Sequence, residues 1–209
     1  MLFSGLTLAL VSAIAVASAP RDVAERPRIV ALGDSLTAGR GIGSASAFPA
    51  ILQQRVDETG LEYTVVNAGV SGDTTTGAVR RLERALEGDV RILIIALGAN
   101  DGLRGVPIEQ LKSNLSRIIE AAQARGITVL LCGMETLPIR GWDYTVAFHN
   151  AYRDLAQRYG VTLVPFILMN VIGKPELMQP DRAHPNADGA RVIAENIWPY
   201  LQPLLPQPV

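Results

Sequence analysis

The chain alternates short apolar runs with longer stretches in which apolar residues recur every three or four positions. Residues 91–97, RILIIAL, are apolar on both faces, which is typical of a central parallel strand buried on both sides. Four other short runs have the length and the aliphatic or β-branched content of strands. The five predicted strands are Arg28–Leu32, Tyr63–Asn67, Val90–Leu97, Ile127–Cys132 and Val161–Val164.

Apolar residues at helical spacing predict helices between and after these strands. The clearest covers residues 107–125, where Pro107 suits the first turn and Gly126 suits a C-terminal cap. A second apolar stripe ends at Gly160. A third helix, capped by Asp73, is predicted to run through Val79, Leu82 and Leu86, and the last helix covers about Ala187–Leu201.

Strand and helix alternate five times, so the fold class is predicted to be α/β. The expected architecture is a three-layer α/β/α sandwich, in which a five-stranded parallel sheet carries helices on both faces. Residues 28–206 are predicted to form one domain, and the polar, proline-bounded residues 20–27 a linker.

Residues 1–19 contain no charged side chain and end in small residues. This pattern resembles a secretory signal, with an A-x-A-like site at Ala15–Ala17 or Ala17–Ala19. The segment lacks a Lys or Arg near its start, so an uncleaved N-terminal anchor is the alternative. We therefore expect an exported protein, periplasmic or secreted, or one that is anchored to the membrane by this segment.

The charge and cysteine content exclude several functions. A net charge of -1 supplies no basic field for nucleic acid or an anionic membrane surface. The single cysteine, Cys132, excludes an intramolecular disulfide and thiol-rich metal sites. Cys132 ends an apolar run and is predicted to be a small buried hydrophobic residue; the alternative, a nucleophilic thiol, needs a nearby histidine.

Polar or glycine-rich segments follow four of the predicted strands. Because the carboxyl ends of parallel strands meet at one edge of a sheet, these segments should lie together. They are Gly33–Ser35, Asn67–Thr74, Gly98–Asp101 and Gly133–Tyr144. A fifth segment, Asp181–Asn186, precedes the last helix and can fold back onto the same edge.

Ser35 is the first candidate for chemistry, although alone it is more typical of a serine that starts a helix and accepts backbone N–H bonds. His149 lies beside the apolar stripe of a predicted helix, where a structural or surface role is expected. His184 precedes Pro185, which disfavours the helical conformation. Asp181 can hydrogen-bond Nδ1–H of His184 and leave Nε2 free to take a proton from Ser35.

A serine nucleophile also needs donors for the oxyanion that develops on its substrate. The side-chain amide of Asn100 and the backbone N–H groups of Gly72 and Ser35 are the candidates. Each has an ordinary alternative, since Asn100 could form a turn and Gly72 could be required for a positive φ. One active site explains all of these residues at one sheet edge together.

With these residues placed, the sequence resembles the GDSL, or SGNH, hydrolases. GDSL at Gly33–Leu36, VSGDT around Gly72, LGAND around Asn100 and DRAHPN at Asp181–Asn186 match the four blocks of that family in order. The resemblance is strongest to its bacterial thioesterase I and arylesterase branch, which is typically exported to the periplasm. One local departure is Arg182, where relatives often carry a glycine.

The resemblance implies a flavodoxin-like sheet, a catalytic triad of Ser35, Asp181 and His184, and an oxyanion hole of Ser35, Gly72 and Asn100. It implies hydrolysis of aryl esters, short to medium acyl esters and acyl thioesters through an acyl-enzyme. A carbohydrate acetylesterase and a lysophospholipase of the same family are the alternatives. No metal or cofactor is implied, and a small-molecule substrate and a monomer are expected.

A different class of function is a non-catalytic nucleotide-binding module that uses the glycines after the first strand. Gly39, Gly41 and Gly43 do not have the spacing G-x-G-x-x-G, and no G-K-[ST] motif occurs. The glycines therefore favour loops beside an acyl site. Five apolar side chains of the adjoining segments are predicted to line that site, although packing between loop and helix is the alternative: Leu103, Leu137, Pro138, Ile139 and Trp142.

Overall fold

The computed structural model describes residues 26–206 and contains one five-stranded, all-parallel sheet with the strand order β2-β1-β3-β4-β5. The predicted segment 1–19 and most of the predicted linker lie outside the described residues. All five predicted strands are confirmed, with ends that differ by one or two residues. They are β1 (Arg28–Gly33), β2 (Thr64–Gly69), β3 (Val90–Ala96), β4 (Thr128–Cys132) and β5 (Thr162–Val164).

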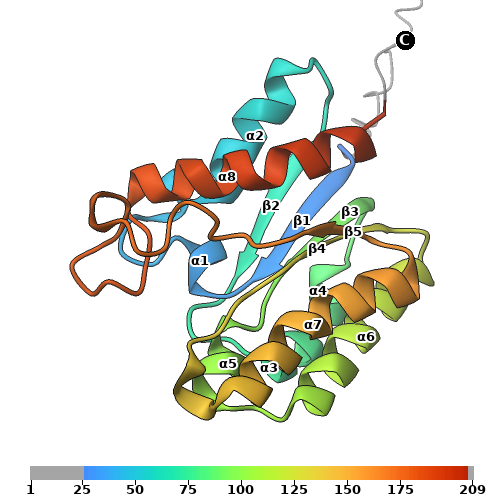
Figure 1. Cartoon of the computed structure of the whole chain (residues 1–209). Helices are drawn as coiled ribbons and strands as arrows, with labels where there is room; N and C mark the ends of the chain where they lie inside the picture. Colours follow the sequence, from blue (N-terminus) through green and yellow to red (C-terminus); the bar gives the residue numbers. More distant parts are fainter. Residues whose placement is uncertain (1–25, 207–209) are drawn as a thin grey trace, which may run out of the picture.

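Helices cover both faces of the sheet, as predicted (Figure 1). On one face lie α2 (Phe48–Glu58) and α8 (Ala187–Leu201), which pack against each other. On the other face lie α6 (Ile108–Gln123) and α7 (Trp142–Tyr159). Shorter helices complete the chain: α1 (Ser35–Ala38), α3 (Thr75–Arg80), α4 (Leu82–Ala85), α5 (Ala99–Arg104), and the 3₁₀ turns η1 (Ser44–Ser46), η2 (Pro138–Arg140), η3 (Pro175–Leu177) and η4 (Gln202–Leu204).

The helix predicted to start at Asp73 was wrong in detail. Thr74 is its N-cap, and its side chain accepts from the N–H of Gly77. The Asp73 carboxylate is instead held by Arg81, whose Nε lies 2.7 Å from Oδ2. Arg81 is also where the helix ends, so two short helices, α3 and α4, replace the single predicted one.

The register of the central strands brings three loops to one place. Gly33 at the end of β1 pairs with Gly69 of β2 on one side and with Ala96 of β3 on the other. From β1 the chain connects to β2 on one side, and the later strands β3, β4 and β5 follow on the other side. In α/β sheets, ligands bind in the crevice at the carboxyl ends of the two strands where the order reverses, here β1 and β3. A side chain at Gly69 would collide with the backbone of α1, since its Cβ would lie 2.3 Å from the N atom of Ala38.

The sheet is the centre of the core. Ile29, Ala31 and Leu32 of β1 and Leu93 and Ile94 of β3 are fully buried. Burial on both faces explains why these strands have apolar residues at consecutive positions. Among residues 26–206, no helix is long and apolar enough to cross a membrane.

Candidate active site

Ser35, His184 and Asp181 form a chain of hydrogen-bonding contacts at the carboxyl edge of the sheet. The Oγ atom of Ser35 lies 3.1 Å from Nε2 of His184, and Nδ1 of His184 lies 2.7 Å from Oδ2 of Asp181. Oδ1 of Asp181 accepts the N–H groups of Ala183 and His184 at 3.0 Å each. These N–H groups and the imidazole lower the pKa of Asp181 to about 2, so its carboxylate is ionised at neutral pH.

The His184 loop is tied to the segment that precedes it. Met178 and Pro185 form an isolated antiparallel bridge, and the N–H of Gln179 donates to the carbonyl of His184 at 2.7 Å. Asn186 caps α8 by accepting the N–H of Gly189. The imidazole is therefore held between a bridge and a capped helix, and its side chain is 16% exposed.

Asp34, and not Ser35, caps the helix α1. Oδ1 of Asp34 accepts the N–H of Leu36 at 3.0 Å, which is the usual function of an N-cap carboxylate. The alternative that the Ser35 side chain caps this helix is therefore wrong. Its hydroxyl contacts His184, and its position as the first helical residue leaves its N–H outside the helical ladder.

The three predicted oxyanion donors lie on the turns after β1, β2 and β3. Gly72 has φ +80°, a conformation that glycine adopts readily, and it belongs to the turn in which the N–H of Asp73 donates to Val70. Asn100 lies in the first turn of α5. Its Nδ2 donates to the carbonyl of Asp73 at 2.9 Å and to Oδ2 of Asp34 at 3.2 Å. Asn100 thus connects the turn of Gly72 with that of Ser35.

Sequence reasoning missed the polar contacts that fix these turns. Arg81 donates to the carbonyls of Gly33 and Ala68 at 2.9 and 2.7 Å, which holds the ends of β1 and β2. The buried Asp101 accepts from the N–H and hydroxyl of Thr75 at 3.0 and 2.5 Å. Burial raises the pKa of Asp101. The only sequence signal was that Asp101 follows Asn100 at a strand end.

The predicted substrate wall is an exposed apolar surface and not an enclosed pocket. Leu103, Leu137, Ile139 and Trp142 are 55%, 57%, 66% and 71% exposed, and Pro138 is exposed as well. The two segments are tied together, because the guanidinium of Arg140 donates to the carbonyl of Leu103 at 3.2 Å and Tyr144 donates to that of Val106 at 2.9 Å.

His149 and Cys132 lie where the sequence predicted. His149 is in α7, and its Nδ1 lies 2.5 Å from Oε1 of Glu135 while Nε2 lies 3.2 Å from Arg153. Cys132 is fully buried, and burial raises the pKa of its thiol. A buried thiol with a raised pKa is a poor nucleophile.

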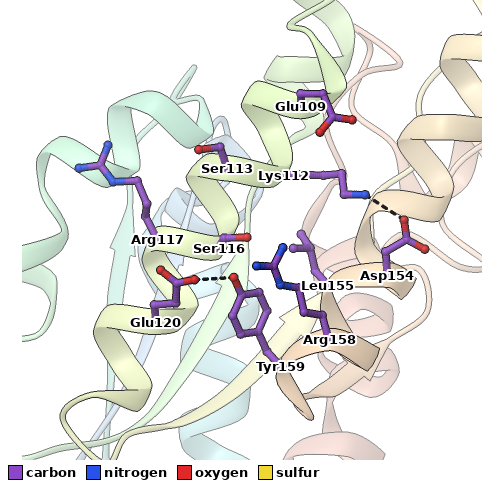
Figure 2. Close-up of a pocket in the computed structure, with 10 residues that line it drawn as sticks. All are labelled: Glu109, Lys112, Ser113, Ser116, Arg117, Glu120, Asp154, Leu155, Arg158 and Tyr159. Atoms are coloured by element: carbon purple, nitrogen blue, oxygen red, sulfur yellow. Dashed lines mark hydrogen bonds and ion pairs between the residues drawn. The ribbon is translucent and has the colours of Figure 1, made fainter.

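A cavity of about 420 Å³ between α6 and α7 contains none of the candidate residues (Figure 2). One ion pair and one hydrogen bond join residues that line it. Lys112 lies 3.0 Å from Asp154, and the hydroxyl of Tyr159 lies 2.5 Å from Glu120. The candidate residues lie instead at the carboxyl edge of the sheet, which carries Ser35.

A model of the GDSL-like lipase/acylhydrolase family matches residues 31–192, which include all five candidate catalytic and oxyanion residues. The chain belongs to this family. It is therefore an enzyme that hydrolyses ester bonds of small molecules.

The names of similar proteins agree with membership of the chain in this acylhydrolase family. Esterase TesA from Pseudomonas aeruginosa is 40% identical over 178 residues, which cover 85% of this chain and 89% of the relative. Thioesterase 1/protease 1/lysophospholipase L1 from Escherichia coli K12 is 36% identical, with 85% and 84% coverage. The crystal structure of the psychrotrophic esterase EstA from Pseudoalteromonas sp., inhibited by monoethylphosphonate, matches with a TM-score of 0.80 at 30% identity and covers 84% of this chain and 97% of that chain.

If Asn100 donates to the oxyanion as predicted, replacing it with alanine should lower kcat by about 10²–10³-fold and change KM little, because one such donor is lost. Steady-state hydrolysis of a p-nitrophenyl ester measures both constants. Asn114→Ala, which removes another side-chain amide that donates to Thr75 and Thr76, is the matched control. If kcat is unchanged in Asn100→Ala, Asn100 has only a structural function.

The buried Asp34 should give stability a distinct pH dependence. Its pKa is raised from 3.8 to about 6, chiefly because burial disfavours the charged form. Between these pH values the native state retains a proton that the unfolded state loses, so stability falls as pH rises, by about 3 kcal/mol. Urea unfolding should therefore show the free energy of unfolding of the native protein falling relative to Asp34→Asn from pH 3.5 to 6.5. A constant difference would mean that Asp34 does not titrate in this range.

Proposed function

We propose that the chain is a serine esterase that hydrolyses carboxylic esters and acyl thioesters through an acyl-enzyme on Ser35. His184 takes the proton of the Ser35 hydroxyl as its oxygen attacks the acyl carbonyl. Asp181 holds the imidazole in the tautomer with hydrogen on Nδ1 and stabilises the imidazolium. The observation that carries the proposal is the chain of contacts from Ser35 Oγ through His184 to Asp181, at 3.1 and 2.7 Å.

The tetrahedral intermediate carries its negative charge on the former carbonyl oxygen. The N–H groups of Ser35 and Gly72 and the amide of Asn100 are proposed to donate to it. The proton on His184 Nε2 then passes to the leaving alcohol or thiol, and the acyl group stays on Ser35. His184 next removes a proton from water, which attacks the acyl-enzyme and releases the acid.

The preferred acyl group is proposed to be lipophilic. The exposed apolar side chains of Leu103, Leu137, Ile139 and Trp142 supply area that an aliphatic or aryl group can cover, at about 25 cal/mol per Å² buried. A carbohydrate acetylesterase would gain little from such a surface. The Escherichia coli relative, named thioesterase 1/protease 1/lysophospholipase L1, supports the thioester and lysophospholipid variants of the same reaction.

A panel of p-nitrophenyl esters and acyl thioesters with two to twelve acyl carbons tests this proposal. We expect kcat/KM to rise with chain length over the first several carbons and to fall when Trp142 is replaced by alanine, most for the longer esters. A preference for acetyl esters of sugars over all longer esters would replace the proposal by the acetylesterase.

Location and assembly are proposals as well. The apolar, small-residue pattern of residues 1–19 supports export, to the periplasm or out of the cell, with an uncleaved anchor as the alternative. A monomer is proposed as well. Mass spectrometry of the mature N-terminus and sedimentation of the purified protein test the two statements.

A further inference from the structure

Asp34 is a buried carboxylate next to the proposed nucleophile, and the cap of α1 uses only one of its two oxygens. The residue is 0% exposed, and its Oδ1 accepts the N–H of Leu36 at 3.0 Å. A serine, threonine or asparagine would cap the helix by the same kind of bond without burying a negative charge, which is costly. Capping therefore does not explain why a carboxylate occupies this position.

The second oxygen of Asp34 contacts the side-chain amide of Asn100. Oδ2 of Asp34 accepts from Nδ2 of Asn100 at 3.2 Å, and the same Nδ2 donates to the carbonyl of Asp73 at 2.9 Å. The two acceptors belong to the turns that follow β1 and β2. Because a side-chain amide nitrogen carries two hydrogens, each acceptor can take one of them.

These two acceptors determine which end of the Asn100 amide faces them. Rotating the amide by half a turn exchanges its NH₂ group with its carbonyl oxygen. That oxygen would then face the carboxylate of Asp34 and the carbonyl of Asp73, with no hydrogen between them. At pH 8 the carboxylate is charged, since the pKa of Asp34 is raised by burial to about 6. The charge makes the rotated form still less favourable.

We propose that Asp34 is a positioning residue of the oxyanion hole, which keeps Asn100 in the orientation that donates to the oxyanion. In the rotated form Asn100 would present an oxygen to the oxyanion and repel it. The longer of its two hydrogen bonds goes to Asp34, and an N–H group can be shared between two acceptors, so the oxyanion can share this hydrogen. This function of Asp34 rests on the proposed esterase function, and Asp34 itself does not touch the substrate.

The variant Asp34→Asn separates positioning from capping. Asparagine is as good an N-cap as aspartate, and its Oδ1 can still accept the N–H of Leu36. Its Nδ2 then faces Nδ2 of Asn100, so two donors meet and the amide loses an acceptor. We expect kcat for p-nitrophenyl butyrate at pH 8 to fall about 10- to 100-fold, with KM within about twofold of the parent, as for partial loss of one oxyanion donor. Urea unfolding at the same pH checks that the variant is folded.

A double-mutant cycle tests whether Asp34 acts through Asn100. In Asn100→Ala no amide remains to be oriented, so adding Asp34→Asn should lower kcat further by less than about threefold. Asp101→Asn is the matched control, because Asp101 is a second buried carboxylate and accepts from Thr75. Within residues 26–206 its carboxylate has no hydrogen bond to Asn100. The fold-change in kcat that Asp101→Asn causes should therefore be the same in the parent and in Asn100→Ala.

Three results would overturn the positioning function of Asp34. One is an unchanged kcat in a folded Asp34→Asn variant. Another is an equal fold-loss from Asp34→Asn in the parent and in Asn100→Ala, because Asp34 would then act independently of the amide. The third is an unchanged kcat in Asn100→Ala, which would leave no donor to position. A parent protein inactive toward every ester would instead refute the esterase function.

Discussion

Replacing Ser35 with alanine should lower kcat for p-nitrophenyl butyrate by about 10⁴–10⁶-fold, the range seen when a nucleophile of a serine hydrolase is removed. The variant lacks the oxygen that forms the acyl-enzyme, so only the residual effect of binding and oxyanion donors remains. Initial rates at saturating ester, with the uncatalysed rate subtracted, measure the loss.

The fold should tolerate this change. Within residues 26–206 the hydroxyl of Ser35 hydrogen-bonds only to the imidazole of His184, and Asp34 rather than Ser35 caps α1. The urea midpoint of Ser35→Ala should therefore stay close to that of the parent protein. Ser116→Ala, in α6 beside the cavity of Figure 2, is the control and should keep full activity. Activity of Ser35→Ala within tenfold of the parent would remove Ser35 from the mechanism.

The two histidines give the second test. His184→Ala should lower kcat by about 10⁴–10⁶-fold, because the base that takes the Ser35 proton and returns it to the leaving group is lost. His149, in α7, contacts Glu135 and Arg153. The variant His149→Ala should therefore keep kcat within a few-fold of the parent. The comparison uses the same p-nitrophenyl ester, with circular dichroism to check that both variants are folded. The opposite pattern would move the catalytic base to His149.

The strands and long helices could be predicted because burial imposes a period on the sequence. The run at residues 91–97 is apolar at every position but the first since β3 is covered on both faces, and α8 begins and ends where the pattern of Ala187–Leu201 does. The start of α3 could not be predicted as well. Asp73 and Thr74 are both good caps, and the choice depends on Arg81, eight residues away from Asp73, which binds the Asp73 carboxylate.

The candidate site could be predicted because its residues occupy strand ends. Ser35, Gly72 and Asn100 follow three strands, and parallel topology brings such ends to one edge whatever the strand order. The partners that fix these residues were not predictable. Asp34 accepts from Asn100, 66 residues away, and Asp101 joins the start of α3 to α5 across 26 residues, and no local pattern encodes either contact.

The exposed apolar surface of these loops shows the opposite limitation. Leu103, Leu137 and Trp142 could be recognised as apolar residues in loops, but their exposure could not, because it depends on how η2 and α5 meet. Arg182 was visible as a departure from glycine. Only the structure shows that it has a positive φ and that Gln179 ties its turn to Arg40.

The central claim is that Ser35 is the nucleophile, and covalent labelling tests it most directly. The purified protein is incubated with a fluorophosphonate, and the labelled residue is identified by intact-protein mass and peptide mapping. We predict one phosphonyl group per chain, on Ser35, no label in Ser35→Ala, and slow labelling in His184→Ala. Labelling at another residue, or equal labelling of the Ser35→Ala variant, would contradict the account.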